Sequence, residues 1–452
     1  MAFIKIVQLI LVLVALSSSS RATSFERFGL KLYSTLGQNN KNENVFVSPV
    51  SISLAMSMCA VGARQETLNQ MLKTFQVSSR EQLIKTAEQI MNVFSIVNQD
   101  KEVQVKLANR LYTQKAYELQ QEYLKIVQNS FKADIKLEDF EHESEQAVQR
   151  INTWVEQQTN NLIHNLLQKS DITPDTRLII INSIYFKGAW MKQFRNNLTD
   201  ENADFHESNG KTSKVKLMYQ KEKFAYAKND DLHIQIVDLP YRSENKDVEF
   251  VFTVILPDQG VELDVIEQKL TSQPNLMQKL LNRQNMKTEL LHLYLPKFKM
   301  ESTFQLNDIL KQLGMKDAFI DYKANFSGIV SEEHNRDQLY ISKVIHKTFL
   351  DVNEQGSEAA AVTAVIINTR SLVFPPPRPI EFKADRPFLF FIRERSEAAA
   401  VTAVIINTRS LVFPPPRPIE FKADRPFLFF IRESRQNIVL FSGRFMSPPK
   451  SS

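Results

Sequence analysis

The sequence predicts an α+β protein built as one large domain. Helical patterns fall mostly early in the 452 residues and strand patterns mostly late. Because the two kinds of element do not alternate regularly, mixed or antiparallel sheets are favoured over a doubly wound parallel sheet. With 43% hydrophobic residues, the chain can bury a large core. No linker rich in glycine, serine or proline precedes residue 354, so residues 23–452 are predicted to form a single domain.

Apolar periodicity predicts the helices. Ser48 and Pro49 fit an N-cap followed by a proline in the first turn, and they open an apolar helix that runs to about Ala63. In the last expected helix, Ser302 can act as the cap and Gly314 can end the helix. The other expected helices cover residues 25–37, 80–97, 115–131, 144–167, 261–283 and 303–313.

Apolar runs rich in β-branched and aromatic residues predict the strands. These cover Val103–Tyr112, Leu178–Tyr185, Leu232–Leu239, Val248–Leu256, Leu290–Leu295, Leu339–Val352, Phe382–Arg393, Phe421–Arg432 and Asn437–Phe445. Residues 354–379 fit neither pattern, since they begin with small residues and end in prolines. Prolines cannot donate backbone hydrogen bonds, so this end is predicted to be extended, exposed chain. A loop this long in a compact domain is usually functional or disordered.

Residues 1–22 are predicted to be a secretory signal peptide. Lys5 supplies a positive start, residues 6–16 are apolar except for Gln8, and residues 20–22 offer small side chains at a cleavage site. The apolar run is too short to span a bilayer, and no later segment is apolar for long enough. We therefore expect a secreted, extracellular protein that makes no membrane contact.

The mature chain would contain one cysteine, Cys59, so no internal disulfide is expected. Cys59 lies on a strongly apolar helix, which predicts a buried, inert thiol. Asn197-Leu198-Thr199 and Asn325-Phe326-Ser327 match the N-glycosylation pattern. In a secreted protein, Asn197 and Asn325 are therefore predicted glycosylation sites.

Charge and motifs argue against several classes of function. The net charge of +5 is modest and both signs are interspersed, which predicts a solvated surface rather than nucleic-acid binding. No G-x-G, H-E-x-x-H, C-x-x-C or G-x-S-x-G pattern occurs. His142 beside Glu143 fits a polar helix start better than a metal site. No enzyme activity, metal or cofactor is expected, although a triad assembled from distant residues stays open.

One segment is written twice. Residues 357–394 recur without a single change as residues 396–433, an offset of 39 residues. Two origins stay open, namely a real tandem insertion and two copies of one cassette fused in a gene model. Only one copy of the strand Phe388–Ile392 can occupy a core position. The other copy would be exposed and prone to aggregation.

Several separate motifs resemble the serpin family, in the family's order and over nearly the whole mature chain. They are Asn44–Ser51, Leu178–Trp190, Leu295–Lys299, Leu310–Met315, Ile341–Lys347, Glu354–Thr363 and Phe421–Phe427. The resemblance implies helices packed on a large mixed main sheet, smaller antiparallel sheets and an exposed reactive loop. It also implies an inhibitor rather than an enzyme. A serine protease cuts the loop and forms an acyl-enzyme, and the freed arm then enters the main sheet as a new strand and traps it.

The resemblance implies a hinge followed by a scissile bond. Small side chains let one face of the hinge strand slip into packed core, and Gly356 is expected to act as a swivel. In inhibitory members, the residue before the cut lies about sixteen residues after the acidic residue that opens the hinge. Counting from Glu354 selects the bond Arg370–Ser371. The hinge residues are Glu354, Gly356, Ser357, Glu358, Ala359, Ala360, Ala361, Val362 and Thr363.

An arginine before the cut fits the carboxylate-floored pocket of trypsin-like proteases. The expected partner is thus a trypsin-like serine protease held in a covalent complex by a monomeric inhibitor. Arg-Ser suits clotting, immune-cascade and digestive enzymes alike. The helix at 80–97 carries only Arg80 and Lys85 as basic residues, so no glycosaminoglycan site is expected there.

The second copy supplies a duplicate bond, Arg409–Ser410. Gly356 precedes the first copy, whereas Arg395 precedes the second, so the first hinge is expected to insert. A cut at Arg409 would add up to roughly 130 Å of extended slack, so Arg409 is expected to behave as a substrate site. The alternative is a non-inhibitory serpin that carries a ligand or is itself a protease substrate because of the doubled loop.

The resemblance also assigns residues to sheet opening. Ser48, Ser51, Asn182 and His346 match a polar cluster beneath the sheet where it must open, and Trp190 matches the site of first loop insertion. Buried Ser, Asn and His are ordinarily satisfied polar groups of the core. Here the structural role and the functional role can coincide.

Overall fold

The computed structural model describes residues 24–97, 100, 102–245, 248–331, 339–357, 418–435 and 438–449. The chain divides into a main unit, Met1–Ala360 with Ile419–Ser452, and a second unit, Ala361–Pro418, of which only Pro418 is among the described residues. The predicted signal peptide, the hinge beyond Ser357, both candidate scissile bonds and the predicted strand Phe382–Arg393 also lie outside them.

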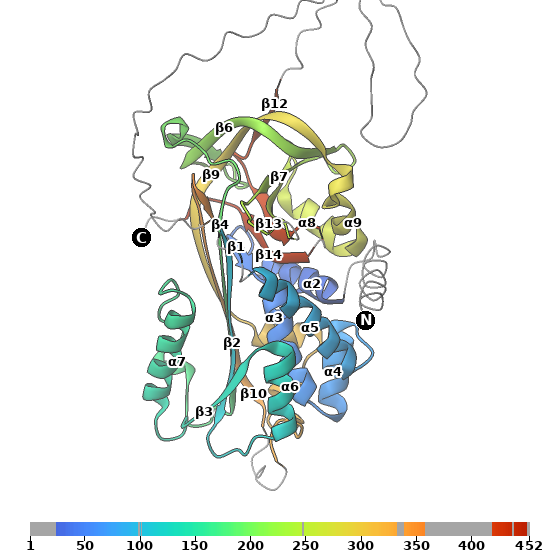
Figure 1. The fold of residues 1–452 in the computed structure, drawn as a ribbon, viewed down its shortest axis with the longest axis vertical. Coiled ribbons are helices and arrows are strands. Elements are labelled where there is room, and N and C mark those ends of the chain that lie inside the picture. The colour runs from blue at the N-terminus through green and yellow to red at the C-terminus, as the bar shows by residue number, and fades with distance from the viewer. Residues whose placement is uncertain are drawn as a thin grey trace, which may run out of the picture. The chain divides into compact units, whose positions relative to one another are not determined.

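One large mixed sheet forms the centre of the main unit (Figure 1). Its strands follow in the order β3 (Asp134–Glu138), β2 (Val103–Gln114), β4 (Leu178–Ala189), β10 (Ile341–Val352) and β9 (Lys287–Gln305). β2 pairs with β3 in parallel and β4 pairs with β10 in parallel, whereas the β2–β4 and β10–β9 pairs are antiparallel.

The long strand β9 continues the sheet into a second region. Its first half pairs with β6 (Thr212–Asn229) on one edge and with β12 (Ile419–Lys422) on the other. From β6 the hydrogen-bonded order runs through β7 (Ile234–Pro240), β8 (Phe250–Pro257), β13 (Phe427–Glu433), β14 (Ile438–Phe445) and β1 (Val45–Val47), and β5 (Asp200–His206) pairs with β6. The predicted α+β class with mixed sheets is therefore confirmed.

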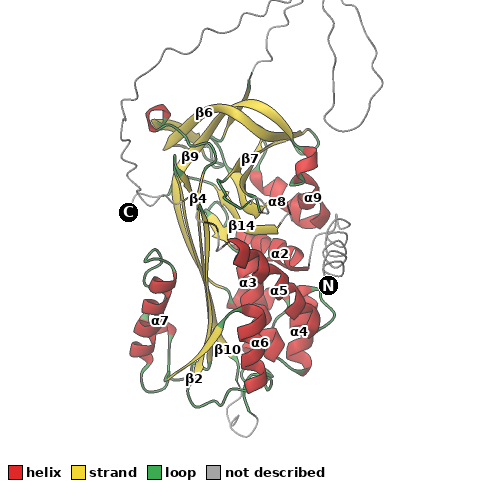
Figure 2. Ribbon diagram, in the orientation of Figure 1, coloured by secondary structure: helices red, strands yellow, loops and turns green. Residues whose placement is uncertain are grey.

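Helices cover both faces of the central sheet (Figure 2). α7 (Ser144–Gln158) stands alone on one face, while α3 (Pro49–Gly62), α5 (Arg80–Val97) and α6 (Gln121–Phe131) gather on the other. α3 is buried along its whole length, and the Ser48 hydroxyl caps it by accepting from Ser51 N at 3.3 Å. The remaining helices are α2 (Ser24–Asn39), α4 (Gln65–Phe75), α8 (Leu263–Ser272), α9 (Pro274–Leu280) and α10 (Asn307–Leu313).

Two apolar clusters hold these layers together. The larger one joins α3 and its neighbouring helices to the sheets, and the smaller one joins α7 to the opposite face through Ile151, Ile179 and Ile345. Cys59 is fully buried in α3, and burial raises the pKa of its thiol, as the prediction of an inert thiol requires. Within the described ranges, no helix is both long and apolar enough to cross a membrane.

Several predicted boundaries are wrong for identifiable reasons. The helix expected over 144–167 ends at Gln158, because Asn160 and Asn161 take left-handed φ values of 52° and 57°. Pro274 divides the segment 261–283 into α8 and α9, since a proline cannot continue a helix. The helix expected over 115–131 begins only at Gln121.

The last expected helix, 303–313, is shorter than predicted. β9 runs through Gln305, so Ser302 lies in a strand opposite Thr348 and is not a helix cap. Gly314 ends α10 with a φ of 120°, as predicted. α4, β1, β3, β5 and β6 were not among the expected elements, nor was the two-residue strand β11 (Gly356–Ser357).

Candidate functional site

The first residues of the predicted hinge already form a short strand, β11 (Gly356–Ser357). Ser357 pairs with Val352 at the end of β10 and with Gly188 of β4, and Gly356 pairs with Ala189. Both hinge residues are buried. The hinge therefore begins inside the central sheet, between the ends of the two strands that flank it.

Glycine at position 356 is required by close packing. A β-carbon there would lie 2.1 Å from the Gly188 carbonyl oxygen and 2.8 Å from Ala189 Cα. Gly356 is not among the described glycines with positive φ, so the expected swivel is not the reason for glycine in this conformation. The side chain of Arg395, which precedes the second copy, would not fit this place.

Glu354 anchors the start of the hinge. Its carboxylate accepts from Lys297 Nζ at 2.8 Å and from Thr199 Oγ1 at 2.9 Å, while its carbonyl accepts from Phe194 N at 2.9 Å. Burial acts to raise the pKa of the carboxyl group, but hydrogen bonds from Lys297, from the backbone N–H of Glu354 and from Thr199 outweigh it and hold the pKa below its usual range. Glu354 is therefore ionised and is held against Lys297 of β9.

Trp190 lies directly beneath this turn. Its indole Nε1 donates to the Asn353 carbonyl at 2.8 Å, and its backbone N–H donates to the Gln355 carbonyl at 2.9 Å. The indole stacks on Tyr241 with ring centroids 4.6 Å apart, and the Tyr241 hydroxyl lies 2.5 Å from Ser357 Oγ. Sequence reasoning missed Tyr241, whose role depends on a contact 116 residues away.

Below the hinge, β4 and β10 are hydrogen-bonded directly to each other. Their parallel register runs from Ile341 opposite Leu178 to Phe349 opposite Tyr185. We call this line of pairing the seam. A strand that continued downward from Ser357 would have to separate β4 from β10 along it.

The four predicted cluster residues meet halfway along the seam. His346 of β10 lies opposite Asn182 of β4. Ser48 N donates to His346 Nε2 at 3.1 Å, so the ring proton is on Nδ1, which donates to Asn182 Oδ1. Asn182 Nδ2 in turn donates to the Ser51 carbonyl at 3.0 Å and to Ser51 Oγ at 2.6 Å. The start of α3 is thus hydrogen-bonded to both strands of the seam.

Burial lowers the pKa of His346 to about 3, although its hydrogen bond with Asn182 acts in the opposite direction. The imidazole is therefore neutral at physiological pH. Sequence reasoning missed a fifth member of this cluster, Asn109 of β2, which lies opposite Asn182 and accepts from its amide. Only the strand register brings Asn109 to this place, and no local pattern points to it.

The two predicted glycosylation sites differ in access. Asn197 is exposed in a short 3-10 turn, Asn196–Leu198. Asn325 is half-buried, its amide donates to Gln65 Oε1 at 3.3 Å, and its Oδ1 accepts from Ser327 N at 3.1 Å. Glycosylation of Asn325 would disturb these contacts, whereas Asn197 is open to solvent.

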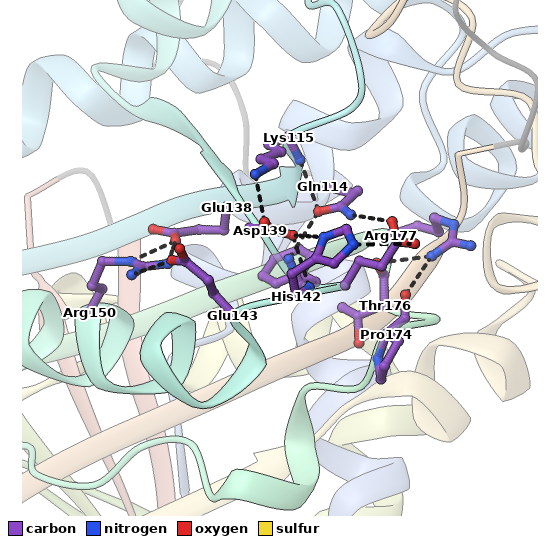
Figure 3. A network of polar contacts seen from close by, with 12 residues as sticks. Gln114, Lys115, Glu138, Asp139, His142, Glu143, Arg150, Pro174, Thr176 and Arg177 are labelled. Atoms are coloured by element: carbon purple, nitrogen blue, oxygen red, sulfur yellow. Dashed lines mark hydrogen bonds and ion pairs between the residues drawn. The ribbon is translucent and has the colours of Figure 1, made fainter.

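A polar network ties α7 to the edge of the sheet (Figure 3). Lys115 Nζ lies 2.6 Å from Asp139 Oδ2, and Arg150 of α7 lies 2.8 Å from Glu138 and 3.1 Å from Glu143. The hydrogen bond from Lys115 lowers the pKa of Asp139 to about 2. His142 and Glu143 precede α7 as a polar helix start. In the described part of the chain, no group of three or more His, Cys, Asp or Glu residues could hold a metal ion.

Comparison with known proteins finds similarity to serpins by family model, by sequence and by structure. The family model described as Serpin (serine protease inhibitor) matches residues 23–397 and 394–448. Human (Homo sapiens) leukocyte elastase inhibitor is 38% identical over 372 residues, which cover 81% of this chain and 93% of that protein. Human antithrombin-III is 35% identical over 382 residues, covering 83% and 78%. The crystal structure of Serpin48, a highly specific serpin of the insect Tenebrio molitor, superposes with a TM-score of 0.72 at 26% identity and covers 94% of this chain and 97% of that one.

Proposed function

This chain belongs to the serpin family of serine protease inhibitors, and from that premise we propose that it is a secreted suicide-substrate inhibitor of trypsin-like serine proteases. The observation that carries the proposal is the position of Gly356 and Ser357. The arm that must insert is already hydrogen-bonded to both strands of the seam at its upper end.

The register of β11 predicts how the arm would continue. Ser357 lies opposite Gly188, so an antiparallel continuation brings Ala359, Ala361 and Thr363 opposite the even-numbered residues of β4 on the same face. Thr363 then lies opposite Asn182. The Thr363 hydroxyl would face the polar cluster at the point where His346 and Asn182 separate.

The length of the arm supports Arg370 as the residue before the cut. Arg370 follows Ser357 by 13 residues, whereas β4 extends only 10 residues from Gly188 down to Leu178. At about 3.3 Å per residue, the extended arm is about 10 Å longer than the strand beside it. Arg370 would therefore be carried past the lower end of the seam together with any protease bound to it.

The chemistry needs only the protease's own machinery. Its catalytic serine attacks the Arg370 carbonyl, an ester forms, and the amide bond to Ser371 breaks with a proton passing to the new amine of Ser371. Insertion of the arm then pulls the acyl-enzyme against the body of the inhibitor. The distorted protease no longer aligns water with the ester, and the covalent complex persists.

Target class follows from this chain's own loop. The names of the two human relatives indicate elastase and thrombin, which are proteases of different preference. A guanidinium at position 370 matches a pocket with a carboxylate at its base through paired, charge-assisted hydrogen bonds. We therefore assign trypsin-like enzymes as targets.

Incubation with trypsin tests the proposal. We expect a complex of inhibitor and protease that survives denaturing electrophoresis, that is lost in Arg370→Ala, and that is retained in the matched variant Arg409→Ala. Clean cleavage without a complex would favour the alternative of a non-inhibitory serpin that acts as a carrier or a substrate.

Secretion has its own test. We propose that residues 1–22 are removed and that Asn197 carries the glycan, because its side chain is the more exposed of the two sites. N-terminal sequencing and intact mass of the protein exported by a secretory host should show both changes. The same mass shows whether the two copies of the repeat are present in one chain. An unprocessed N-terminus would contradict the assignment.

A further inference from the structure

The second copy of the repeat fills a specific place in the sheet. β13 lies between β8 and β14, and β12 lies beside β9. Phe427 and Phe429 are fully buried among aromatic rings of β8, β9 and β14. The buried Arg432 guanidinium donates to Asp238 Oδ2 at 2.6 Å and to Thr253 Oγ1 at 2.8 Å.

The turn between β12 and β13 is also fixed by hydrogen bonds to neighbouring strands. Ala423 N donates to the Tyr294 carbonyl at 3.0 Å, and Arg425 Nε donates to the Pro257 carbonyl at 2.8 Å. Every one of these contacts comes from the segment Ile419–Glu433. That segment is identical, residue for residue, to Ile380–Glu394.

We propose that this place in the sheet is a shared site that either copy can fill, and that Ile380–Glu394 is its second occupant. The protein then exists in two strand-exchanged forms with the same contacts inside the sheet. In the form that the structure describes, the second copy is bound. In the other form, the first copy takes the place of β12 and β13.

Two features outside the repeated segment favour the second copy. Ser434, which follows β13, is buried, and its N–H and hydroxyl donate to Glu249 at 2.8 and 2.9 Å. The first copy is followed instead by Arg395, whose side chain is much larger than that of Ser434, a residue only 7% exposed. The second copy also needs a connection of only four residues to reach Ile438.

Loop lengths give the size of this preference. With the second copy bound, the two connections have 61 and 4 residues, whereas with the first copy bound they have 22 and 43. Scaling closure probability with the −3/2 power of loop length favours the second copy about eightfold, before the contacts of Ser434 are considered. The first copy is therefore the minor occupant, and it becomes the major one when the second copy is damaged.

The exchange has a consequence for inhibition, and this part rests on the proposed function. With the second copy bound, Arg370 and Arg409 both precede β12, so a cut at either frees the hinge arm. With the first copy bound, Arg409 lies in the connection to β14, and a cut there leaves the hinge arm attached. The choice of strand thus decides whether cleavage at Arg409 consumes the inhibitor.

Matched variants in the two copies test the exchange without any protease. Ile431 is fully buried opposite Phe252 and Phe441, so an aspartate there cannot remain in the sheet. We expect Ile431→Asp to fold with a midpoint of thermal unfolding only a few degrees lower, Ile392→Asp to match the unchanged protein, and the double variant not to fold. An unfolded Ile431→Asp, or a folded double variant, would overturn the proposal.

Amide hydrogen exchange identifies the occupant directly. In Ile431→Asp the peptides of the two copies differ in mass, and we expect protection over Phe388–Glu394 and rapid exchange over Phe427–Glu433. The reverse pattern would overturn the proposal. The trypsin assay then separates the two ideas, since loss of the covalent complex refutes the proposed function but leaves the exchange result standing. If the strand exchange and the proposed function both hold, fewer Ile431→Asp inhibitor molecules should be cleaved for each protease molecule trapped than with the unchanged protein.

Discussion

Protonation of His346 should destabilise the folded protein, and the effect on the free energy of unfolding can be worked out from the structure. Burial lowers the pKa of the imidazole from 6.5 to about 3. Between about pH 6.5 and pH 3, His346 is protonated in the unfolded chain but stays neutral in the folded chain. The contribution to stability is therefore complete above pH 6.5 and is lost as the pH falls. At pH 5 the loss amounts to about 2 kcal/mol.

The variant His346→Gln isolates this effect. It keeps a neutral polar side chain in the cluster and removes the group that titrates. The free energy of unfolding is measured at pH 7.5 and at pH 5 for both proteins. Because other groups also titrate in this range, the change between the two pH values in the variant is subtracted from the change in the unchanged protein. We expect this difference to be about 2 kcal/mol.

Urea unfolding followed by circular dichroism at both pH values provides the assay. With a slope of about 3 kcal/mol per molar, the midpoint of the unchanged protein should fall by about 0.7 M more than that of the variant. His142→Gln is the control, because this histidine is 69% exposed and lies at the start of α7, outside the buried cluster around His346. Equal pH dependence in the unchanged protein and in His346→Gln would refute the argument.

Three further predictions concern the hinge and the cluster. Gly356→Val should convert the inhibitor into a substrate, because the valine side chain would collide with the Gly188 carbonyl. A denaturing gel measures the ratio of covalent complex to cleaved chain, and an unchanged ratio would contradict this prediction. Asn109→Ala should lower the free energy of unfolding by about 1–3 kcal/mol, since it removes the buried carbonyl that accepts from the Asn182 amide and from the Ser51 hydroxyl; urea titration measures the change, and an unchanged midpoint would contradict it. Lys297→Met should cost about 1–3 kcal/mol by leaving the Glu354 carboxylate without its cation, and a neutral result would show that Thr199 alone suffices.

Local sequence patterns predicted the structure correctly where it depends on residues that are close together in the sequence. Ser48 and Pro49 start α3 as expected, because capping and a proline in the first turn act within one turn of helix. The boundaries of α5 match the prediction at both ends. The family and the fold class, read from motifs in order, are confirmed.

Patterns failed where long-range pairing decides. Residues 303–305 look helical by periodicity, yet pairing with β10 draws them into β9. Asn109 and Tyr241 belong to the site only because strand register and a stacked indole bring them there. The sequence predicted that Gly356 matters for the hinge. The reason for glycine there is the close approach of β4, a partner strand whose paired residue lies 167 positions earlier in the sequence.

The repeat shows the limit of sequence reasoning most clearly. Two identical segments have identical propensities, so nothing within them can decide which one forms β13. In our proposal the choice rests on features outside the copies, namely the lengths of the connections and the residue that follows each copy, which is Ser434 beside Glu249 in one case and Arg395 in the other. That difference becomes visible only when the neighbouring strand is in place.

The most direct measurement is the thermal unfolding of the chain before and after a single cut behind Arg370. An inserted strand of about ten residues forms hydrogen bonds on both edges and replaces the single row between β4 and β10, a net gain of about ten hydrogen bonds and about 10 kcal/mol. For a chain of this size the midpoint should then rise by about 10 °C or more, and Gly356→Val cut at the same bond should show no rise. If the cut chain unfolds at the same temperature as the intact one, the arm does not enter the seam and the account is wrong.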